Sequence, residues 1–489
     1  MNRQIKLLGI ALMVLFSALF LQLNRLQVFQ ANALAHDSRN TRAVVLDFSK
    51  QRGQILAADG TVLAQSVPTP DVYKYLRQYS NPGLYADVTG FFSFTFGTDG
   101  AERQFNSRLQ GKTVPIRSIT DIVQARPGTA NVNLTIQPSV QQAAAQALGT
   151  QKGAVVALDP RTGAILALYS YPTFDPGLLA QHDQAQVRNT WTQYQDDPAK
   201  PLLPRAYRER YAPGSTFKVV TASAAVAQAP ELVTKTYPTQ PDLALPQTTR
   251  KLSNFAGEVC GGQMPQLLKV SCNTGFAQVG LDLGAQKLSG QATNFGFDTR
   301  PPIDLPAAAV SNFPAPTVFA RNLPALAYSA IGQQDVSASP LQMALVAASI
   351  GNGGIEMTPH LLSRVTDDQS RVIETYQPQV WKQPLDPRQA AQVRDMMVGV
   401  VTGGTGTGAA ISGVQVAGKT GTAQTTPGRA HAWFISFAPA QSPRVAVAVI
   451  VENQNGVGDA ATGGRVAAPI AKTVLQAALA LPDTGPAGP

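Results

Sequence analysis

The sequence predicts an α+β fold built around an antiparallel sheet, and three observations predict it. Residues 138–148 indicate a helix, because Pro138 can open the helix that the following alanines and glutamines continue. Three strand-like runs follow one another late in the chain, at 414–424, 431–440 and 444–453. A second helical pattern closes this region at 465–480. Helices first and last, with consecutive strands late in the chain, are typical of α+β domains.

The chain begins with an apolar segment. Residues 7–23 carry no charge, and as a helix they would span ~26 Å, close to the ~30 Å hydrocarbon core of a bilayer. Arg3 and Lys6 precede this segment, which predicts a cytoplasmic N-terminus and an extracytoplasmic remainder. The alternative is a signal peptide cleaved after Ala33-Leu34-Ala35, although the apolar run is long for one. We therefore expect residues 1–30 to be a cytoplasmic tip and an uncleaved single-pass anchor in the plasma membrane.

Residues 31–130 predict a small β-rich module. Asp59-Gly60 lies between two short apolar runs, a pattern that favours a hairpin. The stretch 79–105 is rich in turn, aromatic and β-branched residues, which predicts irregular β structure. No nucleophile or cluster of ligands falls in this module, so we expect it to be non-catalytic.

We expect residues 131–482 to form a second, larger domain. Residues 153–172 read as a hairpin of two apolar strands around the turn 160–163. Ser339 and Pro340 are typical of a helix start, and the glycines at 351, 353 and 354 of its end. The tail 483–489 is rich in proline and glycine and is expected to be flexible.

Composition argues against several classes of function. The 39 basic and 30 acidic residues give a net charge of +9, but the charge is spread along the chain without the basic and aromatic interleaving of nucleic-acid-binding proteins. The four histidines are scattered, and no cluster has metal-ligand spacing, so neither a metal nor another cofactor is expected. His431 begins an apolar run and is predicted to end a strand rather than to serve as a catalytic base.

The chain has two cysteines, Cys260 and Cys272. Outside the cytoplasm such a pair can form a disulfide. Two separate buried thiols are the alternative, because free cysteines are common in protein cores.

Ser215 and Lys218 form the first candidate site. They follow the helix-breaking pair Pro213-Gly214 and precede an apolar helical pattern. Residues three apart on a helix lie about 5–6 Å apart at Cβ, so the amine can reach the hydroxyl. A serine nucleophile needs a base, and a lysine whose pKa is lowered by burial can supply one. A Ser-x-x-Lys pair also arises by chance about once in such a chain, so a helix cap beside a solvated lysine remains the alternative.

Two further motifs favour the catalytic interpretation. Ser271 and Asn273 form a Ser-x-Asn motif, and residues 419–422 read Lys-Thr-Gly-Thr. By itself, Asn273 could cap a helix and Lys-Thr-Gly could be an exposed corner after a strand. Three elements in this order, at domain-sized spacing, are not expected together by chance.

With these motifs the chain resembles class B high-molecular-weight penicillin-binding proteins, most closely the actinobacterial A type. The triple of motifs is the signature that these proteins share with serine β-lactamases. Further resemblance lies at 52–64, 153–168 and 331–342, and it runs from the anchor to about residue 480. The resemblance implies a penicilloyl-serine transferase domain, with an antiparallel sheet and a helical lobe, after a transmembrane helix and a β-rich pedestal.

The resemblance also implies an activity. The expected reaction is peptidoglycan D,D-transpeptidation, which cross-links stem peptides ending in D-Ala-D-Ala through an acyl-enzyme that β-lactams also form. Four residues are expected to be catalytic: Ser215, Lys218, Ser271 and Asn273. Four are expected to bind substrate: Lys419, Thr420, Gly421 and Thr422. Expected partners are the membrane, a separate glycosyltransferase, since no such domain precedes the catalytic one, and division or elongation proteins.

Three other functions stay open at this point. A β-lactamase of class A needs a glutamate between the second and third motifs, where Glu356 and Glu374 are the ones available. A D,D-carboxypeptidase would differ in using water as the acceptor. A non-catalytic scaffold or sensor that binds peptidoglycan or β-lactams would fit the non-catalytic module.

Overall fold

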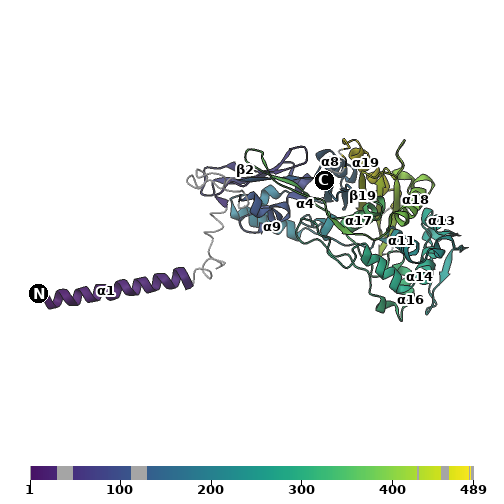
Figure 1. Ribbon diagram of the computed structural model, residues 1–489, viewed down its shortest axis with the longest axis horizontal. Helices are drawn as coiled ribbons and strands as arrows, with labels where there is room; N and C mark the ends of the chain where they lie inside the picture. Colours follow the sequence, from purple (N-terminus) through teal and green to yellow (C-terminus); the bar gives the residue numbers. More distant parts are fainter. Residues whose placement is uncertain are drawn as a thin grey trace. The chain divides into compact units, whose positions relative to one another are not determined.

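The computed structural model describes residues 2–29, 48–111, 129–426, 429–452, 462–483 and 485. The chain forms two compact units: one comprises residues 1–51 and 67–76, and the other comprises residues 52–66 and 77–489. In the first unit α1 (Asn2–Asn24) continues as a π-helical turn, η1 (Arg25–Phe29) (Figure 1). The helix over residues 3–27 contains an 18-residue window with a mean hydropathy of 2.1, and it is long and apolar enough to cross a membrane. The expected apolar helix is therefore present, while the alternative cleavage site at 33–35 lies outside the described residues.

The module predicted near the N-terminus contributes strands to a six-stranded sheet. Its order is β15-β14-β6-β1-β2-β3. The strands are β1 (Ile55–Leu56), β2 (Val62–Pro68), β3 (Tyr75–Tyr79), β6 (Ala130–Leu134), β14 (Leu362–Asp367) and β15 (Val372–Thr375). The hairpin predicted at Asp59-Gly60 is confirmed, because Ile55 pairs with Ala64 across it. Three of the six strands come from beyond residue 130, two of them from the second half of the chain.

The stretch 79–105 is more helical than the sequence predicts. It holds α4 (Pro82–Thr89) and α5 (Gly100–Gln104), followed by α6 (Asn106–Leu109), while β4 (Phe92–Ser93) and β5 (Gly97–Thr98) form only a short ladder. The prediction of irregular β structure was wrong here, because Pro82 opens a helix and burial of its residues 85–89 outweighs their β propensity.

Glu102 of α5 holds this module together from inside. Its carboxylate pairs with Arg52 at 2.8 Å and with Arg77 at 2.5 Å, and all three side chains are buried. Removal of one partner from such a group leaves an uncompensated buried charge, which costs about 3–5 kcal/mol.

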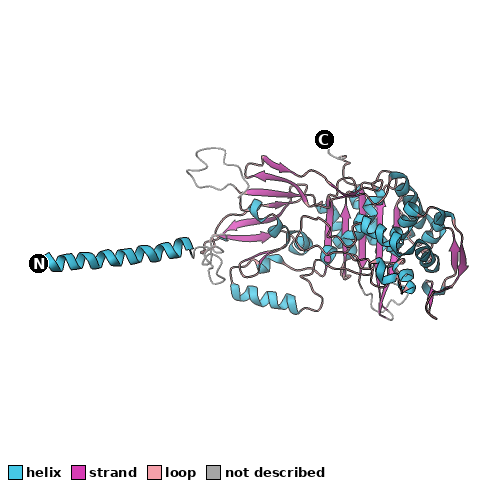
Figure 2. Ribbon diagram, turned by 60° about the horizontal axis from the view of Figure 1, so that its bottom comes forward, coloured by secondary structure: helices cyan, strands magenta, loops and turns pink. Residues whose placement is uncertain are grey.

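The larger domain is built on a five-stranded sheet that is antiparallel throughout, as predicted. Its order is β17-β18-β19-β7-β8, with β17 at an edge. The strands are β17 (Ala417–Thr426), β18 (Arg429–Ala438), β19 (Val445–Val451), β7 (Gly153–Leu158) and β8 (Ile165–Tyr171). Figure 2 shows these strands side by side with helices lying across them.

Both faces of this sheet are buried, which explains the uninterrupted apolar runs in its strands. Successive residues of a strand point to opposite faces: Val155 packs with α8 (Pro138–Leu148) and α19 (Ala467–Leu479), while Val156 belongs to the core that includes α17 (Pro340–Gly351). The helices of the lobe contribute to the same core: α11 (Lys218–Gln228), α13 (Met264–Lys269), α14 (Asn273–Asn294), α16 (Leu323–Ser329) and α18 (Pro387–Gly403).

Shorter elements complete the domain. The helical ones are η2 (Pro176–Leu179), α9 (Gln184–Asp196), α10 (Arg205–Arg208), η3 (Gly214–Phe217), α12 (Glu231–Thr234), η4 (Phe255–Gly257), α15 (Pro316–Phe319) and η5 (Thr407–Ala409). The strands are β9 (Tyr237–Gln240), β10 (Asp242–Ala244), β11 (Lys251–Ser253), β12 (Cys260–Gly262), β13 (Glu356–Met357) and β16 (Val380–Lys382).

Candidate active site

A cavity of about 1200 Å³ lies where the edge strand β17 meets the helical lobe. Ser215 lines it from one element, Ser271 and Asn273 from a second, and Thr420 and Thr422 from β17. The fold therefore brings all three sequence motifs to one cavity, although they are far apart in the chain.

Ser215 lies in the 3₁₀ turn η3, directly before α11. This turn packs against the backbone of β17, and a Cβ atom on Gly214 would come within 2.8 Å of the Thr422 carbonyl oxygen. Gly214 also has a φ of +52°, a conformation that favours glycine. The segment just before the turn is held by the Trp433 indole of β18, which donates to the Ala212 carbonyl at 3.0 Å. In the described part of the chain no hydrogen bond occupies the Ser215 hydroxyl, and this residue is only partly buried.

Lys218 begins α11 and is completely buried. Its amine nitrogen, Nζ, donates to the Ser271 carbonyl at 2.6 Å and to Asn273 Oδ1 at 2.7 Å, with the Ser271 hydroxyl at 3.4 Å. The helical spacing predicted a contact with Ser215, but among the described residues the hydrogen bonds of Nζ go to the Ser-x-Asn motif. The second motif thus holds Lys218, which directly follows the turn η3 that carries Ser215.

Ser271 lies just before α14, and Asn273 is the first residue of this helix. Ser271 has a φ of +60°, a strained conformation for a residue with a side chain. Its hydroxyl accepts a hydrogen bond from Lys419 Nζ at 2.9 Å while Lys218 approaches from the other side. Ser271 therefore lies between the two lysines. The interpretation of Asn273 as a simple helix cap does not hold, because its amide oxygen accepts from Lys218.

Lys419 and Thr420 belong to β17, where they pair with Ile435 and Phe434 of β18. Lys419 is completely buried, and its Nζ also donates to the Thr420 carbonyl at 2.9 Å. Thr420 and Thr422 line the cavity, while Lys419 does not. The amine of Lys419 therefore lies behind the cavity wall, and Lys-Thr-Gly is not an exposed corner.

The electrostatics of the site are dominated by these two buried amines. Burial lowers the pKa of Lys218 well below its ordinary value, and the nearby charge of Lys419 lowers it further. Burial alone lowers the pKa of Lys419 to about 7. A lysine with a lowered pKa can be neutral at physiological pH and can then accept a proton.

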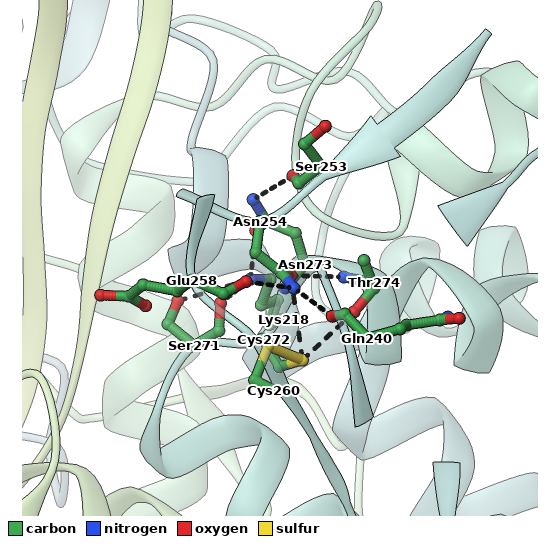
Figure 3. Close-up of a disulfide and its surroundings, with 10 residues drawn as sticks. All are labelled: Lys218, Gln240, Ser253, Asn254, Glu258, Cys260, Ser271, Cys272, Asn273 and Thr274. Carbon is green, nitrogen blue, oxygen red and sulfur yellow. Dashed lines mark hydrogen bonds between the residues drawn. A yellow bond between two sulfur atoms is a disulfide. The ribbon is translucent and has the colours of Figure 1, made fainter. Parts of the chain in front are cut away.

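Cys260 and Cys272 form a disulfide, and Cys272 lies between the two residues of the Ser-x-Asn motif (Figure 3). The bond joins β12 to the start of α14, with 5.8 Å between the two Cα atoms. His431, in contrast, is buried in β18 against the ring of Tyr211, and it does not line the cavity.

Two residues of the site carry no motif that sequence reasoning used. Thr405 lines the cavity, and its hydroxyl is 2.6 Å from that of Thr420. The glycine-rich run at 403–408 was the available signal. Asn254 also lines the cavity and contacts the segment that carries Asn273, but nothing in the local sequence marks it.

Comparison with known proteins identifies the family. Residues 153–476 match the penicillin binding protein transpeptidase domain. The chain belongs to the penicillin-binding proteins. Residues 52–131 match the penicillin binding protein A dimerisation domain. The family inferred from the three motifs is therefore confirmed.

Relatives resemble this penicillin-binding protein along nearly its whole length. It is 43% identical to the peptidoglycan D,D-transpeptidase PbpA of Mycolicibacterium smegmatis, covering 98% of this chain and 99% of the relative. It is 41% identical to PbpA of Mycobacterium tuberculosis, again over 98% and 99%. A ceftriaxone acyl-enzyme structure of penicillin-binding protein A from M. tuberculosis matches with a TM-score of 0.82 and 40% identity, covering 89% of this chain and all of that one. The transpeptidase fold predicted from sequence is confirmed.

Proposed function

We propose that this penicillin-binding protein is a membrane-anchored peptidoglycan D,D-transpeptidase that works through an acyl-enzyme on Ser215. The observation that carries the proposal is the convergence of the three motifs on one cavity, with Lys218 held by Ser271 and Asn273 beside the nucleophile turn. The curated relatives with 41–43% identity are peptidoglycan D,D-transpeptidases, which supports the same reaction.

In the acylation step the Ser215 hydroxyl attacks the carbonyl carbon of the D-Ala–D-Ala bond. Lys218, neutral because burial lowers its pKa, takes the hydroxyl proton. The C–N bond then breaks, and a proton passes to the departing D-alanine amine by way of the Ser271 hydroxyl, which lies between the two lysines. The donor peptide is left as an ester on Ser215.

The Lys-Thr-Gly strand binds the donor peptide. The hydroxyls of Thr420 and Thr422 donate to its terminal carboxylate, with the charge of Lys419 behind them. The backbone N–H groups of Ser215 and Thr422 stabilise the negative oxygen that develops on the attacked carbonyl. Gly421 lets the nucleophile turn approach, since a Cβ atom there would come within 2.9 Å of the Pro213 carbonyl oxygen.

In the second step the amine of a neighbouring stem peptide attacks the ester. An amide bond forms, Ser215 regains its proton, and the two stem peptides are cross-linked. β-Lactams enter the same route at the first step, because their strained amide acylates Ser215 and leaves no separate fragment to diffuse away. The N-terminal helix keeps this chemistry at the outer surface of the plasma membrane, in septal or growth-zone synthesis beside a separate glycosyltransferase and division or elongation proteins.

The experiment is intact-mass spectrometry of the purified protein for several hours after benzylpenicillin is added, with Ser215→Ala as the matched control. We expect a stable covalent adduct on the wild type and none on the variant. An adduct that forms and disappears within seconds while penicillin is consumed would indicate a β-lactamase. No adduct on the wild type would contradict the enzyme and favour a binding scaffold.

The acceptor is tested with a D-Ala-D-Ala pentapeptide in the presence of a second peptide that carries a free amine. We expect release of D-alanine together with a cross-linked product. Release of D-alanine with hydrolysed peptide and no cross-linked product would show that the protein is a carboxypeptidase rather than a transpeptidase.

A further inference from the structure

The first turn of α14 has no cap from its own sequence. The helix begins at Asn273, and the side chain of Cys272, at the capping position, accepts no hydrogen bond from a backbone N–H of the turn; its sulfur contacts the Thr274 hydroxyl at 3.4 Å instead. Cap positions favour Ser, Thr, Asp or Asn, whose side-chain oxygen accepts from the first free N–H groups. The sulfur of Cys272 belongs to the disulfide, and sulfur is a much weaker acceptor than the oxygen of these side chains.

Asn254 supplies the missing cap from a distant part of the chain. Its Oδ1 atom accepts from the backbone N–H groups of Asn273 and Thr274, each at 2.9 Å. Its Nδ2 atom donates to the carbonyls of Gln240 at 2.9 Å and Glu258 at 3.0 Å. The side chain is almost completely buried, and both of its polar atoms are bonded (Figure 3).

The neighbouring residue fixes the catalytic amide itself. Asn273 Nδ2 donates to the Ser253 carbonyl at 3.2 Å, which directs Oδ1 of the same amide toward Lys218 at 2.7 Å. The end of β11 therefore holds Asn273 twice, by its backbone through Asn254 and by its amide through Ser253. Because Asn273 Oδ1 accepts from Lys218, a displacement of Asn273 would also displace the amine of Lys218, which accepts the proton of Ser215 in the proposed reaction.

We propose that Asn254 is a positioning residue for acylation, which sets the first turn of α14 and through Asn273 sets Lys218. This inference rests on the proposed function. Among the hydrogen bonds of the described residues, Asn254 makes none to Lys218 or Ser215, and the connection from it to Lys218 runs through Asn273. The disulfide joins the same segment to β12, but only the amide of Asn254 meets the backbone donors of the turn.

The test measures the second-order rate constant for acylation by a fluorescent penicillin, with full-length protein in detergent. We expect Asn254→Ala to lower this constant by about 10- to 100-fold, the loss that a small misplacement of catalytic groups causes. Asn254→Asp retains the acceptor for both N–H groups and loses the two donors. It should therefore keep most of the wild-type rate constant while melting at a lower temperature.

Asp183 provides a matched control. It caps α9, where one carboxylate oxygen accepts from the N–H groups of Ala185 and Gln186 at 2.9 and 3.2 Å, and it does not line the cavity. Asp183→Ala removes the same type of cap and should leave the acylation rate constant unchanged. A drop equal to that of Asn254→Ala would show a general effect of cap loss and would overturn the inference.

A double-mutant cycle decides between positioning and simple destabilisation. If Asn254 acts through Asn273, Asn254→Ala combined with Asn273→Ala should acylate no more slowly than Asn273→Ala alone. Additive losses, or a wild-type rate constant in folded Asn254→Ala, would overturn the inference while the proposed function stands. If Asn254→Ala does not fold, Asn254→Ser takes its place in the cycle with the same criteria. If the wild-type protein itself is not acylated by penicillin, that result would instead contradict the proposed function.

Discussion

Lys218 and Lys419 are two buried amines with a serine hydroxyl between them. In the part of the chain that the structure describes, neither forms an ion pair with a carboxylate. Two uncompensated charges in such a place are costly, so the pKa of each is lowered. A substrate or penicillin carries the carboxylate that the site lacks. Its binding should return a proton to Lys419, while Lys218 stays neutral for catalysis.

This arrangement predicts a bell-shaped pH dependence. The acylation rate constant should rise with pH as Lys218 loses its proton, and the midpoint should lie well below the ordinary lysine value. It should fall again as free Lys419 loses its proton, with a pKa of about 7. Acylation by benzylpenicillin between pH 5 and pH 10 measures both limbs. Lys419→Arg keeps its charge in this range, so the alkaline limb should disappear; a flat wild-type profile would contradict the assignment.

Removal of the disulfide should destabilise the domain measurably. Cys260→Ser with Cys272→Ser opens a short loop, for which a loss of about 2–4 kcal/mol in unfolding free energy is expected. Urea unfolding of the wild type with and without reductant, beside the double variant, measures it. The reduced wild type and the variant should agree. A variant as stable as the oxidised wild type would refute this prediction.

At the residue scale the sequence predicted which motifs come together, but not the residues that support them. Ser215, Lys218, Asn273 and Lys419 could be found because the proposed chemistry needs these residue types in a recognisable order. Asn254 could not, because its role depends on a contact with a helix that starts 19 residues later, and an asparagine in a loop is unremarkable by itself. The expected contact between Lys218 and Ser215 also depended on tertiary partners, since Ser271 and Asn273 accept from the amine in the structure.

At the scale of elements, the contact between α4 and β8 contains a buried titratable group, Asp87. Asp87 of α4 is buried against β8, where one carboxylate oxygen has no hydrogen-bond partner among the described residues. Burial raises its pKa to about 7, although Ser170 and the charges of Arg205 and Arg208 act in the opposite direction. A carboxyl with a raised pKa contributes stability below its unfolded value near 4, and this contribution is lost as pH rises through about 7.

Asp87→Asn should therefore stabilise the protein at pH 8 and have little effect at pH 5. The amide resembles the protonated carboxyl and carries no charge to bury, so we expect Tm at pH 8 to rise by about 2–4 °C. Differential scanning calorimetry at both pH values measures it. Asp99→Asn is the control of opposite sign, because Asp99 pairs with Arg208 and its loss should lower Tm. Destabilisation by Asp87→Asn at pH 8 would show that Asp87 is ionised and well solvated.

The two large sheets differ in how far sequence periodicity could predict them. The five-stranded sheet could be predicted because its strands are apolar, buried on both faces and largely consecutive in the chain. The six-stranded sheet could not, because β14 pairs with β6 across more than 220 residues: Leu362 lies opposite Leu134. Local periodicity identifies a strand but does not identify its partner when the two are so far apart in the chain. The module boundary that we expected at residue 130 falls within this sheet, at the start of β6.

For the whole molecule, the N-terminal helix is the feature on which the proposed location of the reaction depends. Residues 3–27 have the length and hydropathy of a membrane span, and Arg3 and Lys6 lie at the end that the positive-inside rule keeps in the cytoplasm. Substrate peptides that hang from lipid-linked or polymeric glycan lie on the other side. Catalysis by the proposed route therefore requires that the chain crosses the membrane once and that its cavity faces outward.

The full chain should float with lipid vesicles in a density gradient, and a chain without residues 2–29 should remain at the bottom. Because the anchor supplies no residue to the cavity, both forms should acylate with penicillin at the same rate constant. In intact cells, a protease added outside should digest the domain that carries Ser215 and should spare a tag fused before Arg3. Digestion of the tag with protection of the domain would reverse the orientation. Release of the full chain from the membrane as a shortened form, with a new N-terminus after Ala35, would instead show that the apolar segment is a cleaved signal peptide.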